Sequence, residues 1–400
     1  MLSEVCMCEK ADTAHMEQPN IAPPTDAIAA VMHPDPYPWY ARLREGPALV
    51  RDERLGLWVA SRADVLQEAF ANPALRVRPP AEPVPRAIAG TPAGELFGRL
   101  VRMNDGAPHA AHKPVLHRAL GALDLGGVRA AMTRIAAQVP APTVAEACLA
   151  WPVAGVAHLL GFADEELPVL AEWTRDFVAC LSPLSTEAQL RAASEAAAAL
   201  MARFEALVAA RPVREGSLLA AVRAQAPGDA SHALLANLVG LLSQTCEATA
   251  GLLGNSLVAL AREPGAGDAI AGRADLLPAL VEETARHDPS VQNTRRFVAE
   301  PTTVAGTRLE AGDAVLLVMG AANRDPLLNA QPDRFMLERD GRCMLGFGHG
   351  PHGCPGQALA CALAVAGVEA LLARGLDLAA LRERGWHYRP SANARIPVFH

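Results

Sequence analysis

Residues 347–356 hold the side chains best suited to chemistry in this chain, in the order Phe-Gly-His-Gly-Pro-His-Gly-Cys-Pro-Gly. The glycines and prolines exclude a helix or a central strand, so we expect a tight loop whose backbone passes close to another group. A largely apolar, helix-like pattern follows up to Gly375, and Pro355 suits its first turn. Cys354 therefore precedes a helix start, where unpaired N–H groups and the helix dipole favour a thiolate.

A thiolate in such a loop is a metal ligand or a nucleophile. Two specific alternatives for the loop are a zinc site and a structural cysteine. Cys343, His349, His352 and Cys354 lie within twelve residues and carry the side chains of a four-ligand zinc site. Their spacing lacks the paired Cys-x-x-Cys arrangement of many such sites, which counts against zinc. A buried structural cysteine in a glycine-rich turn is the second alternative.

The loop resembles the haem-binding loop of the cytochrome P450 family, Phe-Gly-x-Gly-x-His/Arg-x-Cys-x-Gly, and each fixed position matches. The resemblance implies haem b (iron protoporphyrin IX) as cofactor and Cys354 as the axial ligand of its iron. Phe347, Gly348 and Gly356 would lie close to the haem, where small residues admit a flat macrocycle. His352 stands where the family places a group that binds a haem propionate.

Length and composition favour a large, mainly helical chain. Of the 400 residues, 51% are hydrophobic and only 4% aromatic, and alanine is abundant. The net charge of −7 comes without a basic block, so we expect no nucleic-acid partner. No run of apolar residues is long enough to span a membrane, which predicts a cytoplasmic protein with no membrane association. We expect a flexible tail over residues 1–24 and a single cytochrome P450 domain over residues 25–400.

A second segment resembles the family just ahead of a predicted helix. Residues 103–109, followed by Lys113, are similar to the family pattern Asp-Pro-Pro-x-His-x-x-x-Arg. His109 and Lys113 are one helical turn apart and share a face, which suits two donors to one haem propionate. Lysine keeps the charge of the usual arginine but loses its bidentate geometry, and Pro114 is unexpected inside the helix. Taken alone, such a pair is more often a solvated helix face.

The longest helical pattern covers residues 229–263 and is apolar on most sides, so it should cross the interior. Its middle resembles the oxygen-activating helix of the family, Ala/Gly-Gly-x-Asp/Glu-Thr. Glu247 matches the acid, but Ala248 replaces the threonine that helps to deliver protons. Gln244 lies one turn earlier on the same face, and we hypothesise that its amide, a water or the substrate replaces the hydroxyl. Thr249 points about a hundred degrees away and is a weaker candidate. Alternatively, Gln244 only bonds a neighbouring helix.

Three further charged residues resemble a structural motif of the family. Glu283 and Arg286 share a helix face and match its Glu-x-x-Arg, which pairs with an arginine from a later loop, here Arg334. We expect these three to form a buried ion network that fixes the loop near Cys354 without taking part in catalysis. Arg296, in a strand predicted over residues 291–297, falls at another propionate-binding position, and Arg295 is the alternative.

The matched features follow the order of the family from His109 onward. The implied fold is mainly α, the cytochrome P450 fold, a triangular helical domain with small β-sheets. Two strand-like runs at residues 48–51 and 57–60, around a polar turn, predict a hairpin in one of those sheets.

The resemblance implies a monooxygenase that inserts one oxygen atom from O2 into a small or medium apolar organic substrate by hydroxylation or epoxidation, in secondary or specialised metabolism. No nucleotide-binding or iron–sulfur segment is present, so electrons should come from a ferredoxin and its reductase, docked near Arg102, Lys113 and Arg118. We expect a monomer. Because Ala248 replaces threonine, peroxide-driven, substrate-assisted or non-oxygenase chemistry is an alternative. A haem or ligand sensor is a second one.

Overall fold

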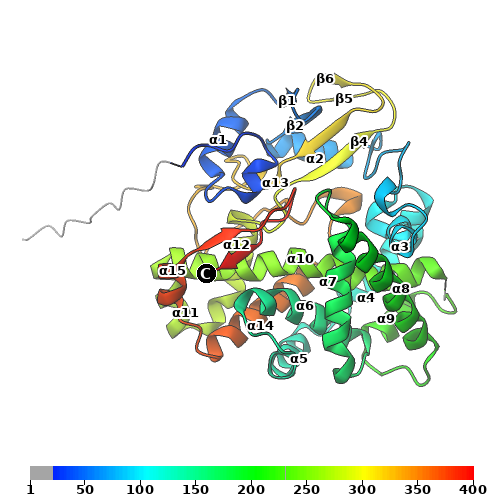
Figure 1. Cartoon of the computed structure of the whole chain (residues 1–400). Helices are drawn as coiled ribbons and strands as arrows, with labels where there is room; N and C mark the ends of the chain where they lie inside the picture. The colour runs from blue at the N-terminus through cyan, green and yellow to red at the C-terminus, as the bar shows by residue number, and fades with distance from the viewer. Residues whose placement is uncertain (1–20, 230) are drawn as a thin grey trace, which may run out of the picture.

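The computed structural model describes residues 21–229 and 231–400, so most of the predicted tail lies outside it. Helices make up most of the molecule; the larger sheet and one hairpin lie together on one side of it, and the C-terminal hairpin lies apart from them, next to the long helix (Figure 1). The predicted fold class, mainly α with small β-sheets, is confirmed. Pro24, at the end of the predicted tail, is already buried.

The larger helices form the body of the molecule. They are α4 (Ala107–Gly121), α5 (Leu125–Gln138), α6 (Val144–Leu160), α7 (Leu167–Ala179), α8 (Glu187–Ala209), α10 (His232–Arg262), α12 (Leu277–His287) and α14 (Gln357–Ala373). The shorter helices are α1 (Tyr37–Glu45), α2 (Ala63–Ala71), α3 (Pro92–Arg99), α9 (Leu218–Gln225), α11 (Pro264–Gly272), α13 (Met319–Ala322) and α15 (Leu378–Arg384). Turns of 3-10 helix are η1 (Ala29–Met32), η2 (Arg86–Ile88), η3 (Val101–Met103), η4 (Asp164–Glu166), η5 (Ala274–Leu276) and η6 (Gly350–His352).

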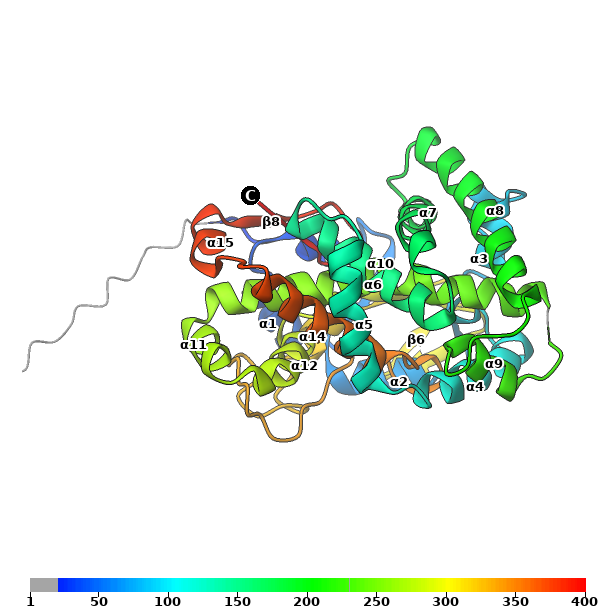
Figure 2. The ribbon, with the colours of Figure 1, turned by 90° about the horizontal axis from the view of Figure 1, so that it is seen from below.

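Helix α10 runs through the middle of the molecule, and α6 and α14 pack against it (Figure 2). It begins after Ser231, whose hydroxyl oxygen accepts a hydrogen bond from the Leu234 N–H, and it ends before Pro264. Every residue from position 249 to position 261 is buried. The prediction of a long interior helix over residues 229–263 is therefore confirmed to within three residues.

Two glycines let other elements lie directly on α10 or against it. A Cβ at Gly367 of α14 would collide with Leu253. A Cβ at Gly254 would lie 2.6 Å from Pro397 Cγ, at the start of β9. Small residues at these contacts bring α14, and with it the loop before α14, close to the middle of the molecule.

The strands form one five-stranded sheet and two hairpins. They are β1 (Leu49–Asp52), β2 (Leu57–Ala60), β3 (Leu75–Arg76), β4 (Thr294–Val298), β5 (Thr302–Val304), β6 (Thr307–Leu309), β7 (Ala314–Leu317), β8 (Trp386–Tyr388) and β9 (Pro397–Phe399). The larger sheet has the order β1-β2-β7-β4-β3, and β2 pairs in parallel with β7. β1 and β2 pair antiparallel, so the predicted hairpin is confirmed.

A buried polar cluster that the sequence does not reveal ties three distant segments together. The Arg395 guanidinium is fully buried and its Nε donates to Asp288 Oδ1 over 2.8 Å. The Tyr37 hydroxyl donates to the same oxygen over 2.6 Å, and Arg395 also donates to the Val31 carbonyl over 3.0 Å. The cluster joins η1 and α1 to the end of α12 and to the segment before β9.

Within residues 21–229 and 231–400, no single helix is both long and apolar enough to cross a lipid bilayer. Only α14 and α15 taken together reach that length and composition, and they meet at a bend of 99°.

Candidate functional site

The loop of residues 347–356, here called the cysteine loop, is held closed by its own backbone. The Cys354 N–H donates to the Phe347 carbonyl over 2.8 Å. Gly348 and Gly350 have φ angles of +75° and +64°, which L side chains rarely adopt. The predicted tight loop is thus present, and its end carries Cys354 up to the start of α14.

The Cys354 thiol is exposed on one side and surrounded by protein on the others. Burial raises the pKa of the thiol, and neither the Gly356 N–H that donates to the sulfur nor the charge of Lys113 reverses this shift. The N–H at the helix start thus favours the thiolate, as expected, but burial of the thiol outweighs it in the protein alone. The zinc alternative fails, because the described residues contain no group of three or more His, Cys, Asp or Glu side chains placed to hold a metal ion.

Two histidines meet beside the cysteine loop. His352 Nε2 lies 2.9 Å from Asp105 Oδ1, and its ring centroid is 4.4 Å from that of His109. His109 Nε2 is buried without a hydrogen-bond partner, and burial together with nearby cations lowers the pKa of its imidazole. Asp105 is a member of this cluster that sequence reasoning missed, although it stands at the acidic position of the segment that resembles the family.

Helix α4 also directs Lys113 to the cysteine loop. Lys113 Nζ donates to the Gly353 carbonyl over 2.6 Å, and burial lowers the pKa of the ammonium. The predicted shared direction of His109 and Lys113 is present, since both contact the cysteine loop. Pro114 lies within α4 without ending it.

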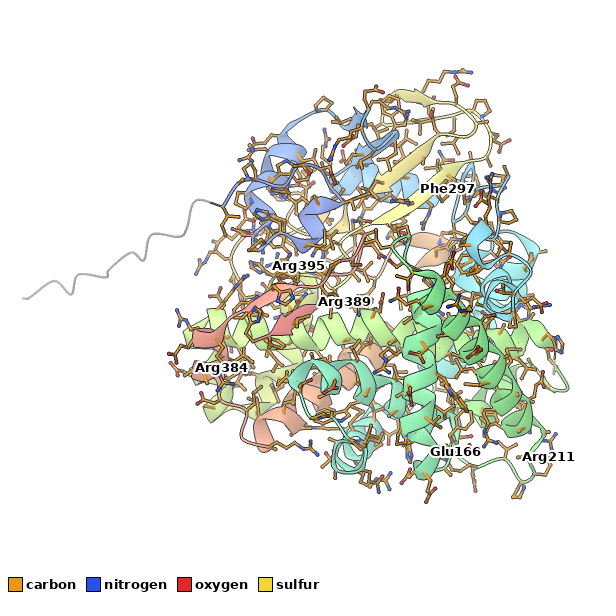
Figure 3. All side chains as sticks on the ribbon, viewed as in Figure 1. Glu166, Arg211, Phe297, Arg384, Arg389 and Arg395 are labelled. Atoms are coloured by element: carbon orange, nitrogen blue, oxygen red, sulfur yellow. The ribbon has the colours of Figure 1, made fainter. Side chains whose placement is uncertain are left out.

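Strand β4 buries one of two neighbouring arginines. Arg296 is 6% exposed, lies over the Phe70 ring at 5.1 Å and donates to the Arg295 carbonyl over 2.9 Å. Burial lowers the pKa of Arg296 to about 10, and Asp105 opposes this shift only through space. The neighbouring Arg295 is exposed, because successive side chains of a strand point to opposite faces. The label of Phe297 in Figure 3 marks the place of β4. A buried guanidinium that forms no ion pair within the described chain fits a bound carboxylate such as a propionate.

In the middle of α10, one face of the helix is only half-buried. Gln244, Glu247 and Ala248 are half-buried, whereas Thr249 is 2% exposed. Gln244 Nε2 donates to the Gly240 carbonyl of its own helix over 2.8 Å, so the alternative that it bonds a neighbouring helix is wrong. Gln244 and Ala248 share a face, as predicted from their spacing.

Glu247 forms an ion pair with Arg389, which comes from the segment after β8 and lies next to α10 in Figure 3. Glu247 and Arg389 line a cavity of about 400 Å³ that also contacts Arg175 and Asp176 of α7 and Ser185 in the following turn. This cavity joins the middle of α10 to the outer layer made by α7 and α8.

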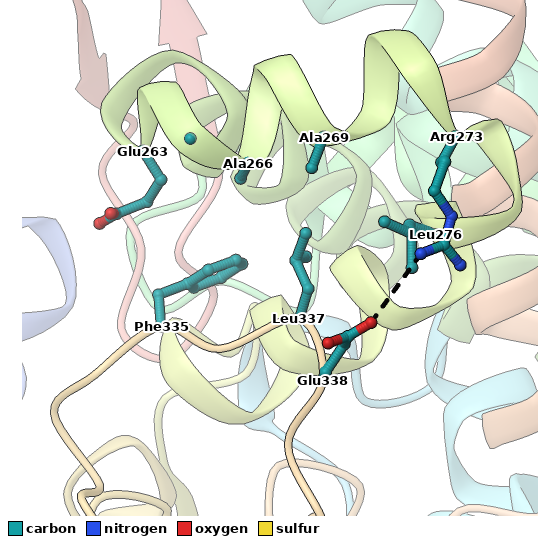
Figure 4. A pocket seen from close by; sticks show the side chains of 9 residues that line it. Glu263, Ala266, Ala269, Arg273, Leu276, Phe335, Leu337 and Glu338 are labelled. Carbon is teal, nitrogen blue, oxygen red and sulfur yellow. Dashed lines mark ion pairs between the residues drawn. The ribbon is translucent and has the colours of Figure 1, made fainter.

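A second cavity, of about 490 Å³, lies between α11, η5 and residues 335–338 (Figure 4). Arg273 and Glu338 form an ion pair of 3.9 Å at its edge. None of the predicted site residues lines this cavity.

The buried ion network contains the predicted pair but a different third residue. Glu283 and Arg286 are fully buried and pair over 2.7 Å. The additional cations are Arg339, whose Nε lies 3.0 Å from Glu283 Oε1, and Arg342, whose Nε lies 3.2 Å from Glu283 Oε2.

The prediction that Arg334 is the third cation is therefore wrong. The chain turns so that the Arg334 carbonyl, and not its side chain, accepts hydrogen bonds from Arg286 and Arg339. The Arg334 guanidinium is exposed and donates to Gln331 Oε1 over 2.7 Å.

The predicted docking cations do not form one surface. Arg118 is exposed and donates to Gln225 Oε1 over 2.6 Å. Lys113 is directed to the cysteine loop, and the Arg102 side chain is turned inward, where burial lowers its pKa.

Comparisons with known proteins agree with this geometry. The family model for cytochrome P450 matches residues 272–373, which include Glu283, Arg286 and the cysteine loop. The monooxygenase PikC of Streptomyces venezuelae is 31% identical over 367 residues, covering 86% of this chain and 85% of its own. The vitamin D(3) 25-hydroxylase of Pseudonocardia autotrophica is 30% identical over 365 residues, covering 84% and 85%.

The crystal structure of CalO2 has a TM-score of 0.75 and 26% identity, and the match covers 94% of this chain and 96% of that one. The residues present fit a haem, because Cys354 is exposed, because Arg296 is buried and forms no ion pair within the described chain, and because His109 Nε2 is buried without a hydrogen-bond partner there. On the likeness to PikC and the other relatives, together with this site, the chain belongs to the cytochrome P450 family of haem-dependent monooxygenases.

Proposed function

We propose that this chain binds haem b and inserts one oxygen atom from O2 into a small or medium, mainly apolar organic substrate, by hydroxylation or epoxidation. Cys354 is the observation that carries the proposal, because its sulfur is exposed at the end of a closed glycine loop while protein surrounds its other sides. The bound haem would supply the reductive activation of dioxygen. We place the reaction in secondary metabolism.

The residues that hold the haem come from three elements. Cys354 would supply the thiolate that binds the haem iron, and Phe347, Gly348 and Gly356 would form the surface of the loop next to the haem. The propionates are bound by residues of α4, β4 and the loop: His109, Lys113, Arg296 and His352. Among these, the Lys113 ammonium and the Arg296 guanidinium lose solvation on folding, so each gains stability from a carboxylate partner.

The half-buried face of α10 delivers the protons that the reaction consumes. Glu247 is paired with Arg389, so this ion pair opens before Glu247 Oε1 can receive a proton from the cavity. Gln244 stands one turn from Ala248, and its amide orients the water or substrate group that takes the place of the missing hydroxyl. Thr249 is buried away from this face and takes no part.

Electrons come from a ferredoxin and its reductase, with the exposed Arg118 on the docking face. The enzyme acts as a monomer in the cytoplasm. The names of relatives such as PikC, a monooxygenase, support the class of reaction.

A second candidate function follows from one residue. Ala248 offers no hydroxyl, and Gln244 already donates to Gly240, so the face of α10 holds fewer free proton donors than the family pattern supplies. Peroxide-driven, substrate-assisted or non-oxygenase chemistry at the same haem requires fewer proton donors on this face.

Turnover with isotopically labelled oxygen distinguishes the two functions. Compounds from a panel of fatty acids, terpenoids and macrolides that shift the haem spectrum are incubated with a surrogate ferredoxin, its reductase and labelled O2, and in parallel with hydrogen peroxide. We expect one labelled oxygen atom in the product of the first reaction. Product from peroxide alone would favour the second candidate, and spectral binding without product in either reaction would contradict both.

A further inference from the structure

The 3-10 turn η3 carries an arginine that has no anionic partner in the described chain. Arg102 Nε is buried without a hydrogen-bond partner, and the rest of the side chain is half-buried. Burial lowers the pKa of Arg102, and Glu247 is the acidic residue whose charge opposes that shift through space. Because Glu247 is already paired with Arg389, it does not neutralise Arg102.

The backbone around Arg102 is fixed against α10. The Val101 N–H donates to Asn237 Oδ1 over 2.6 Å. A Cβ at Gly240 would lie 2.9 Å from Leu100 Cδ2, so the residue just before η3 lies directly on the helix at that turn. Gln244, at the start of the half-buried face, is one turn further along. Arg102 is therefore held near the half-buried face of α10, where the proposed function places the substrate.

The two propionates of the haem do not require Arg102 as a partner. Haem b has two propionates, and Lys113 of α4 and Arg296 of β4 already supply two cations for them. A desolvated guanidinium is costly without an anion, and its planar fork binds a carboxylate through two parallel hydrogen bonds.

We propose that Arg102 binds a carboxylate of the substrate, so that the substrates are organic acids with an apolar body. This inference rests on the proposed function and narrows its substrate class. The apolar body would lie against the half-buried face of α10, and the acid group would lie at η3.

Matched acids and esters test this assignment. Dodecanoic acid, cyclohexanecarboxylic acid and 1-naphthoic acid, each with its methyl ester, are titrated into haem-loaded wild-type protein and into Arg102→Gln, and the spectral shift of the haem gives Kd. We expect the wild type to prefer at least one acid over its ester. Arg102→Gln should weaken binding of that acid by about tenfold to a hundredfold and leave the ester within about twofold, the loss expected for one charge-assisted pair.

Arg99→Gln is the matched control, because Arg99 lies three residues earlier, at the end of α3, is 39% exposed in its side chain and pairs with Glu95 over 3.4 Å. This variant should keep the preference for the acid. The inference is overturned if the wild type prefers no acid, or if the preference persists in Arg102→Gln. It is also overturned if Arg102→Gln loses haem on gel filtration, which would make a haem propionate the partner. A wild type without a thiolate-type carbon monoxide spectrum would instead overturn the proposed function.

Discussion

At the residue scale, the proposed function makes the sulfur of Cys354 the ligand of the haem iron. Replacement by alanine removes the thiolate ligand, so we expect Cys354→Ala to lose the thiolate-type spectrum of the reduced carbon monoxide adduct, along with oxygenase activity. Cys343→Ala is the matched control, since Cys343 is also a free and exposed thiol of the preceding segment. A thiolate-type spectrum that persists in Cys354→Ala would refute the assignment.

Gln244 makes a separate prediction about protons. If its amide orients the group that replaces the missing hydroxyl, Gln244→Ala should lower the yield of product per reducing equivalent, with the lost electrons appearing as peroxide. Ala248→Thr, which restores a hydroxyl one turn away, should raise that yield. Both are measured from consumption of the reduced cofactor against product formed. An unchanged yield in Gln244→Ala would show that the amide only bonds Gly240, as it does in the resting structure.

At the element scale, the segment between Gln331 and Arg342 is fixed on α12 by one carboxylate. Glu283 is fully buried and pairs with Arg286, Arg339 and Arg342. Glu283→Gln leaves these cations without their anion, so we expect unfolding by urea to need ~3–5 kcal/mol less free energy. Glu282→Gln is the control, because the neighbouring carboxylate is half exposed and its single ion pair contributes about 1 kcal/mol or less. Equal losses in the two variants would contradict a buried network.

Local patterns made part of this site predictable. Glu283 and Arg286 are three residues apart on one helix, and α10 has a serine cap and no internal proline, so the sequence determines both. The choice of Arg339 over Arg334 depends on the path of an irregular segment whose carbonyls turn inward, and no periodicity encodes that path. The inward turn of Arg102 likewise depends on how Leu100, just before η3, packs on Gly240, a contact between segments far apart in the chain.

At the scale of the whole molecule, acid should destabilise the fold through His287. Burial, with Arg324 adding to it, lowers the pKa of His287 to about 3, and the ring lies against Tyr37 and Phe335. The unfolded chain takes up a proton near pH ~6.5, whereas the folded chain does not until much lower pH. The folded state therefore loses stability as the pH falls from ~6.5 toward about 3, at up to ~1.4 kcal/mol per pH unit for His287.

Urea unfolding at several pH values between about 6.5 and about 4.5 measures this slope. His287→Gln should show a shallower dependence, whatever its stability at neutral pH. His117→Gln, at an exposed position of α4, should keep the slope of the wild type. Parallel slopes for all three proteins would mean that other groups carry the acid sensitivity.

The order of strands in the five-stranded sheet has a consequence for synthesis in the cell. Trp58 of β2 lies opposite Val315 of β7, so about 250 residues must be translated between one strand and its neighbour. At ~5–20 residues per second, a ribosome needs roughly ten to fifty seconds for that stretch. Throughout this interval the nascent hairpin presents an open edge to other chains. The yield of active enzyme therefore depends on how well chaperones shield that edge until β7 emerges.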